Sequence, residues 1–364
     1  MADATRPAPD EVSENRHPAL TEFLIGHDPA ERTLLAASQS AKLHHAWMIT
    51  GPAGIGKATL AYRFAKFLLR DEASGGGLFG DGPSDLSVPV DDLDASQVAA
   101  QSHPNLRIIR RAWNKDRNRY FGVIRIDDIR ALTPFFGQTV GGNGRRVVIV
   151  DCADDMNTNA QNAILKSLEE PPANTILLLI CNAPGAMLPT IRSRCRRLPL
   201  SSLTRDQAAE VLRLQAPEIP AGDFEDLLTI ADGSPGQAMR LEAAGGLVLY
   251  REVRDLMAAL PGTPYDAVSK LAQKTEKAGD GEVLFAIVMD LIEGEIRRAL
   301  TRAVVPDGAD GFRISPDALD PWLEVCDKIA RLRDRAAAVN LNRKAVIQAV
   351  FSEMQSAART RKAG

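Results

Sequence analysis

The sequence predicts an α/β domain built on a parallel sheet, followed by a small helical domain and a C-terminal all-α domain. The first observation is a glycine-rich turn at residues 51–57, which lies between an apolar strand, 46–49, and a helical pattern. The second is an aliphatic run, 147–150, which is followed by an acid and is typical of a buried parallel strand. The third is the chain after residue 203, where helical apolar spacing recurs.

The glycine-rich turn has the spacing of a phosphate-binding loop. Its defining residues are Gly51, Gly54, Gly56 and Lys57. At such a turn, backbone N–H groups and a helix dipole converge on an anion, and Lys57 is predicted to reach the β- and γ-phosphates. Ala58 replaces the usual hydroxyl ligand of Mg²⁺, and Thr59 lies about 100° further around the helix. Two interpretations stay open: a nucleotide site, and a loop kept for packing.

A carboxylate follows the aliphatic run at 147–150. Asp151 is at the position that holds Mg²⁺ in hydrolysing ATPases, but Cys152 replaces the glutamate that orients the attacking water. A thiol does not perform that task well, and Asp154 or Asp155 would need a different backbone path to reach the same point. We therefore expect little or no intrinsic ATPase activity.

Two further blocks, together with these motifs, resemble the AAA+ clamp-loader subunits of bacterial replicative DNA polymerase. The blocks are residues 157–172, which end in Leu-Glu-Glu-Pro-Pro, and the triplet Ser193-Arg194-Cys195. The similarity covers nearly all of the chain from about Leu24 and is strongest from Ala46 to Met239. It implies a RecA-like AAA+ P-loop domain, a small helical lid domain and a C-terminal all-α collar domain.

The resemblance also assigns roles to single residues. Arg194 matches an arginine finger, which enters a neighbouring subunit's ATP site and neutralises charge on the γ-phosphoryl group; without the family context it would belong to a surface arginine cluster. Asn182, after the next apolar strand, matches a polar sensor of the γ-phosphate, although it could equally cap a turn. Relatives that hydrolyse ATP carry an arginine where this chain has Gly236. Ala58, Cys152 and Gly236 thus resemble the non-hydrolysing branch of the family.

The function implied is that of a rigid, stator-like subunit in ATP-dependent loading of the sliding clamp onto primed DNA. The expected partners are γ/τ and δ subunits in a hetero-pentameric ring and, through that complex, the clamp and primer–template DNA. The chain would then be a component of the DNA polymerase III holoenzyme, a nucleotidyltransferase, with ATP or ADP and Mg²⁺ bound without turnover. Two alternatives are an ATP-hydrolysing γ/τ-type motor and a P-loop phosphotransferase such as a nucleotide kinase, which lacks the Ser-Arg-Cys triplet and collar layout.

Composition favours a cytoplasmic protein, and the resemblance implies a location at the replisome or nucleoid. The chain has 364 residues, 45% of them apolar, and a net charge of −3, so its overall charge does not attract nucleic acid. No apolar run approaches the ~20 residues of a membrane span, and the N-terminus lacks a secretory signal pattern. Many relatives carry a four-cysteine zinc module, but no zinc is expected because the cysteines are scattered without a Cys-x-x-Cys pair. They are Cys152, Cys181, Cys195 and Cys326.

The pattern divides the chain into four segments. We predict a disordered tail at 1–18, the AAA+ domain at 19–202, a three-helix lid at 203–244 and the collar, an oligomerisation domain, at 245–364. Residues 71–101, rich in Gly and Asp, are predicted to be a mobile insertion in place of the zinc module.

A basic run with interleaved aromatic residues follows that insertion. Residues 108–109 and 123–126 are predicted to be strands on either side of a turn. A solvated surface and a contact with a partner or DNA both stay open for this run. Its residues are Arg107, Arg110, Arg111, Trp113, Lys115, Arg117, Arg119 and Tyr120.

Overall fold

The structure is a computed structural model that describes residues 17–40, 43–70, 83–89, 91–116, 119–138, 144–276, 281–304, 312–339 and 341–359. These residues form two compact units. The first unit comprises the described residues of Met1–Ile219 and Ala231–Arg240, and the second those of Pro220–Ile230 and Leu241–Gly364. No helix in the described ranges combines the length and the apolar character needed to span a membrane.

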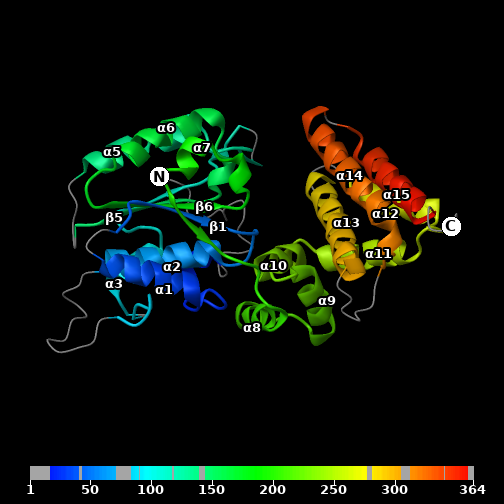
Figure 1. The fold of residues 1–364 in the computed structure, drawn as a ribbon, viewed down its shortest axis with the longest axis horizontal. Coiled ribbons are helices and arrows are strands. Elements are labelled where there is room, and N and C mark those ends of the chain that lie inside the picture. The colour runs from blue at the N-terminus through cyan, green and yellow to red at the C-terminus, as the bar shows by residue number, and fades with distance from the viewer. Residues whose placement is uncertain are drawn as a thin grey trace. The chain divides into compact units, whose positions relative to one another are not determined.

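The first unit is built on a five-stranded parallel sheet. In order across the sheet, its strands are β2 (Leu106–Ile109), β5 (Arg146–Val150), β6 (Thr175–Cys181), β1 (Ala46–Thr50) and β7 (Arg196–Pro199). One face is covered by α1 (Asp28–Gln39), α2 (Lys57–Leu69) and α3 (Leu93–Ala99), the other by α5 (Leu132–Gly137), α6 (Thr158–Glu169) and α7 (Pro189–Arg192) (Figure 1). The predicted parallel α/β domain is confirmed.

Strand residues alternate between two hydrophobic cores, because successive side chains of a strand point to opposite faces. From β5, Val147 and Ile149 enter the core that contains Phe64 of α2. Val148 and Val150 enter the core on the α6 side. All residues of β1, β5 and β6 are buried, which explains why their sequences are mostly apolar and do not alternate with polar residues.

The N-terminal end of the described chain is packed. Residues 1–16 of the predicted tail lie outside the described residues. His17 is buried, and its Nδ1 accepts a hydrogen bond of 2.9 Å from the Ala19 N–H. Pro18 opens a short 3₁₀ helix, Pro18–Leu20, so the predicted tail extends two residues too far.

Part of the predicted insertion is a helix rather than a mobile segment. Residues 71–82 and 90 lie outside the described residues. The side chain of Asp92 caps α3 by accepting a 2.8 Å hydrogen bond from the Ala95 N–H. Val98 and Leu86 are fully buried in the core beside α2. The prediction of a mobile segment rested on Gly and Asp content, which does not indicate these buried apolar contacts.

The basic run forms a different structure from the predicted pair of flanking strands. β2 pairs with β5, whereas Ile124 makes only an isolated bridge to Met156. The Asp128 carboxylate accepts a 2.8 Å hydrogen bond from the Arg125 N–H at the start of α4 (Ile126–Arg130), where a strand was expected. Between them, β3 (Trp113–Asn114) and β4 (Arg119–Tyr120) form a two-stranded ribbon.

Two arginines of the run have contacts within the first unit. The Arg111 Nε lies 3.1 Å from the Asp155 Oδ2, and the guanidinium of Arg107 lies 5.6 Å from the ring centre of Phe135. Arg117 lies outside the described residues. Contact of this surface with DNA or a partner stays a prediction.

Helices follow β7 for the rest of the described chain. The range predicted for the lid holds α8 (Arg205–Gln215), α9 (Ala221–Ala231) and α10 (Pro235–Ala243). The C-terminal range holds α11 (Gly246–Ala258), α12 (Tyr265–Lys274), α13 (Gly281–Val304), α14 (Leu319–Val339) and α15 (Arg343–Arg359), which share one hydrophobic core. Thr204 caps α8, as its sequence predicts, in a capping box with Gln207. The four-segment domain division stays a prediction.

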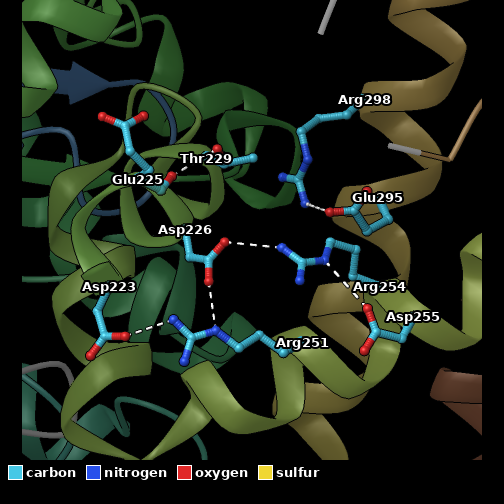
Figure 2. Close-up of polar contacts among 9 residues, drawn as sticks. All are labelled: Asp223, Glu225, Asp226, Thr229, Arg251, Arg254, Asp255, Glu295 and Arg298. Atoms are coloured by element: carbon cyan, nitrogen blue, oxygen red, sulfur yellow. Dashed lines mark hydrogen bonds and ion pairs between the residues drawn. The ribbon is translucent and has the colours of Figure 1, made fainter. Parts of the chain in front are cut away.

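Ion pairs join α9 to α11 within the second unit (Figure 2). Arg251 of α11 donates from Nε to Asp226 Oδ2 at 2.7 Å and from Nη2 to Asp223 Oδ1 at 2.6 Å. Arg254 donates from Nη1 to the other oxygen of Asp226 at 3.1 Å. Asp226 therefore accepts from both arginines, and we call these four residues the α9–α11 clasp.

Replacing Asp226 with asparagine is expected to lower the melting temperature of the second unit by roughly 3 °C. The change removes the negative charge that both arginines share, and the loss should shrink at high salt because the pairs are partly exposed. Asp255→Asn is the control, because its 3.6 Å pair with Arg254 is largely solvent-exposed. Equal melting temperatures for both variants at low salt would contradict a stabilising clasp.

Candidate functional site

A pocket of about 200 Å³ lies at the carboxyl edge of the parallel sheet, within the first unit. This is the edge where open α/β sheets bind ligands. The phosphate-binding loop, the ends of β5 and β6, the segment before α1, and residues of α8 and α10 line it. Of the predicted site residues, the pocket brings together Gly54, Gly56, Lys57, Thr59, Asp151 and Asn182.

The loop after β1 needs glycine at two positions for different reasons. A Cβ at Gly51 would lie 2.4 Å from the backbone oxygen of Leu200, so only glycine permits this approach. Gly56 has φ +107° and is the N-cap of α2, a left-handed conformation that favours glycine. The loop thus turns sharply from the buried strand into the helix and leaves the first helical N–H groups at the pocket.

Lys57 is the first residue of α2 and is only 4% exposed. Its Nζ donates a 2.7 Å hydrogen bond to the backbone oxygen of Gly51 and a second, short one to that of Pro52. These carbonyl oxygens accept the hydrogen bonds of the ammonium group that phosphate oxygens would accept in a nucleotide complex. The lysine is therefore held at the mouth of the loop, with its ammonium group hydrogen-bonded to the loop itself.

Burial is the main influence on the pKa of Lys57. It lowers this pKa from 10.5 to about 8, although nearby Cys152, Asp154, Cys181 and Asp151 act in the opposite direction. A phosphate anion beside the ammonium group would favour its charged form. The pocket is thus electrostatically suited to an anion.

Cys152 occupies the strained position next to the predicted metal-binding carboxylate. Its backbone is left-handed, with φ 55° and ψ 61°, which is uncommon for a residue other than glycine. The Asn182 Nδ2 lies 3.6 Å from the Cys152 Sγ, which lies 3.9 Å from the Asp151 Oδ1. The three side chains meet at the pocket, and Cys152 supplies a thiol where ATPases that hydrolyse ATP have the water-orienting glutamate.

The two acids after Cys152 have other partners. Asp154 accepts hydrogen bonds of 3.0 Å from the N–H groups of Asn182 and Ala183, so it fixes the chain after β6. Asp155 pairs with Arg111. The prediction that neither acid replaces the missing glutamate agrees with this geometry, while the anchoring role of Asp154 was not foreseen.

The described residues fit a nucleotide phosphate better than a protein-held metal. Within the ranges that the structure describes, no three His, Cys, Asp or Glu side chains group in a way that could hold a metal ion. Asp151 and the hydroxyl of Thr59 both line the pocket and could assist a Mg²⁺ ion that phosphates bring with them.

Arg194 lies outside this pocket. Its Nη2 is 2.9 Å from the Glu169 Oε1, and its Nη1 donates a 3.0 Å hydrogen bond to the Thr190 backbone oxygen. The side chain is 38% exposed. It comes two residues after α7, which lies on the opposite side of the sheet from α2 (Figure 1), and it is not among the residues that line the pocket.

Sequence reasoning missed one wall of the pocket. His17, Thr21 and Tyr62 line it, and the buried His27 places its Nε2 2.7 Å from the backbone oxygen of Ile55. Desolvation is the main reason that the pKa of His27 is lowered, which favours the neutral ring. No local pattern indicates these contacts, because they join segments 28 or more residues apart.

Comparison with known proteins gives a consistent family. The family model described as "DNA polymerase III, delta subunit" matches residues 26–204. DNA polymerase III subunit delta' of Pseudomonas aeruginosa is 38% identical over 202 residues, covering 55% of this chain and 56% of that protein. The Escherichia coli delta' subunit is 29% identical over 213 residues, covering 58% and 59%. The Bacillus subtilis tau subunit is 28% identical over 228 residues, covering 62% and 37%.

The chain therefore covers less than two thirds of the length of each of these relatives. A solved gamma-subunit-related protein from Thermotoga maritima covers 91% of this chain and 100% of its own at 18% identity and a TM-score of 0.46, too low to support the assignment. The region matched by the family model contains the phosphate-binding loop, Asp151, the Leu-Glu-Glu-Pro-Pro block and Arg194. On these sequence matches, the chain belongs to the delta' family of DNA polymerase III subunits.

Proposed function

We propose that this chain is a stator-like clamp-loader subunit that does not turn over ATP and supplies Arg194 to a neighbouring ATPase subunit. The observation that carries the proposal is the pocket itself: it keeps Lys57 and Asp151 but has Cys152 where hydrolysis needs a water-orienting base. The exposed guanidinium of Arg194, outside its own pocket, is accessible to a second subunit.

The proposed partners follow from the relatives, which are named as delta', tau and gamma/tau subunits of DNA polymerase III. We propose a hetero-pentameric ring with γ/τ and δ subunits, which loads the sliding clamp onto primer–template DNA in the cytoplasm. The C-terminal helices would form the collar of that ring.

ATP or ADP with Mg²⁺ is the proposed static ligand of the pocket. Lys57 and the N-terminal turn of α2 would hold its phosphates, and Asp151 with Thr59 would assist the metal. A bound nucleotide supplies negative charge that Lys57 neutralises. Without a water-orienting base, the chain's residues bind and orient the phosphates but do not activate water.

The competing function is an ATP-hydrolysing γ/τ-type motor. The test is ATP turnover by the purified full-length chain, alone and with its γ/τ- and δ-type partners. We expect the chain alone to match its own Lys57→Ala variant at background, and the assembled complex to hydrolyse ATP in the presence of clamp and primed DNA. Turnover by the chain alone that Lys57→Ala abolishes would establish the motor instead.

A further inference from the structure

The phosphate-binding loop is bound directly by the start of α10. The Gly236 N–H donates a 2.9 Å hydrogen bond to the Gly54 backbone oxygen. The hydroxyl of Ser234, which is only 4% exposed, donates a short hydrogen bond to the backbone oxygen of Ala53. Two consecutive carbonyls of the loop are thus bonded to two residues that lie about half the chain away in sequence.

This approach is close enough to require a glycine on each side. A Cβ at Gly236 would lie 2.9 Å from both the Cα and the oxygen of Gly54, and a Cβ at Gly54 would lie 2.6 Å from the Gln237 nitrogen. All of these neighbours are backbone atoms, which cannot rotate away as a side chain can. Any larger residue at position 236 must therefore separate α10 from the loop.

Residues 233–236 are also hydrogen-bonded to the segment that leads into α8. The Leu203 N–H donates a 2.9 Å hydrogen bond to the Gly233 oxygen, and a Cβ at Gly233 would lie 2.5 Å from the Leu203 oxygen. Residues 233–236 are therefore fixed between the loop and the chain that enters α8.

We propose that Ser234 and Gly236 form a latch that holds the start of α10 on the phosphate-binding loop independently of nucleotide. The latch keeps this part of the first unit in one conformation whether or not the pocket contains a ligand. An arginine at position 236 would break the latch rather than add a working contact to the γ-phosphate. The latch goes beyond the proposed function and does not depend on partner subunits.

Amide hydrogen exchange of the purified full-length chain tests the latch, because the N–H of residue 236 is its reporter. In the wild type, we expect slow exchange at this amide that changes less than about twofold on adding ADP or a non-hydrolysable ATP analogue with Mg²⁺. Gly236→Ala is expected to accelerate this exchange by about tenfold or more, since its Cβ must push the loop away. Ser234→Ala, which cannot clash, should give a smaller acceleration.

Gly222→Ala is the matched control, because an added Cβ there would meet no atom within 4 Å. It should leave exchange at residue 236 unchanged. The latch is refuted if the wild-type amide becomes protected only when nucleotide is added, or if Ser234→Ala and Gly236→Ala both exchange like the wild type. These outcomes are independent of partner ATPase activity, so failure of the latch and failure of the proposed function can be told apart.

Discussion

Replacing Arg194 with alanine is expected to lower the rate of ATP hydrolysis at the neighbouring subunit's site by about 10³-fold or more. A guanidinium that neutralises charge on the transferred phosphoryl group acts only in the transition state, so its loss affects turnover more than nucleotide binding. The stability of the chain itself should change little. Among the described residues, the Arg194 side chain makes an exposed pair with Glu169 and a bond to one backbone oxygen.

The measurement is pre-steady-state ATP hydrolysis by the assembled complex. Steady-state turnover is less suitable because the other ATP sites of the complex also contribute to it. Arg192→Ala is the control: it removes an exposed arginine two residues earlier, at the end of α7. Arg194→Lys should stay impaired, since an ammonium group keeps the charge but loses the planar fork of donors. Equal hydrolysis by Arg192→Ala and Arg194→Ala complexes would show that Arg194 is no finger.

The sheet could be predicted from sequence because its signal is local. Residues 147–150 and 176–180 are aliphatic without interruption, and both stretches are buried on two faces. The glycine spacing of the phosphate-binding loop is also visible in a short window, and Gly56 is required by its own left-handed backbone. Gly51, in contrast, is required by its approach to the backbone of Leu200. The first unit's α/β architecture therefore follows from short windows of sequence.

Elements that depend on distant contacts were predicted less well. Residues 123–126 have the composition of a strand, yet Ile124 makes an isolated bridge to Met156, and the Asp128 carboxylate binds the Arg125 N–H at the start of a helix. Residues 93–99 lie beside Gly- and Asp-rich sequence, but Val98 has a buried place beside α2 that orders them. In both cases tertiary packing overrode local composition.

The candidate site shows the same division. Lys57, Asp151 and Asn182 converge as the motif spacing predicts, because parallel strands end at one edge. The contact between Ser234 and Ala53 could not be foreseen, since it spans 181 residues and one partner is a backbone oxygen. The sequence marked Gly236 as a missing arginine, whereas the structure gives the glycine a positive role in close packing.

The second large effect concerns the stability of the first unit and its dependence on pH. The folded pKa of Lys57 is about 8, below its ordinary 10.5, so between these values the unfolded chain binds more protons. Stability attributable to this group therefore rises with pH across the window from about 8 to 10.5. This pKa shift corresponds to about 3 kcal/mol of unfolding free energy. Below pH 8, the charged Lys57 lowers the stability of the folded chain by that full amount.

Lys57→Met removes this titration and keeps a side chain of similar length. The unfolding free energy of the variant minus that of the wild type is expected to fall by about 3 kcal/mol between pH 7.5 and 10.5. Urea unfolding of the first unit at several pH values measures it, and other titrating groups cancel in the difference. Lys166→Met, on an exposed position of α6, should show a constant difference. A constant difference for Lys57→Met would mean that its ammonium group is well solvated.

The same lysine links stability to ligand binding. Nucleotide phosphates favour the charged ammonium group, so binding above pH 8 should take up a proton, and affinity should decrease as pH rises toward 10.5. ADP with Mg²⁺ is then expected to raise the melting temperature of the wild type at pH 7.5, less at pH 9.5, and not at all in Lys57→Met. If the loop served only for packing, Lys57→Met would stabilise the chain and would not remove any ligand binding. A wild type whose melting temperature does not respond to nucleotide would refute an anionic ligand at this loop.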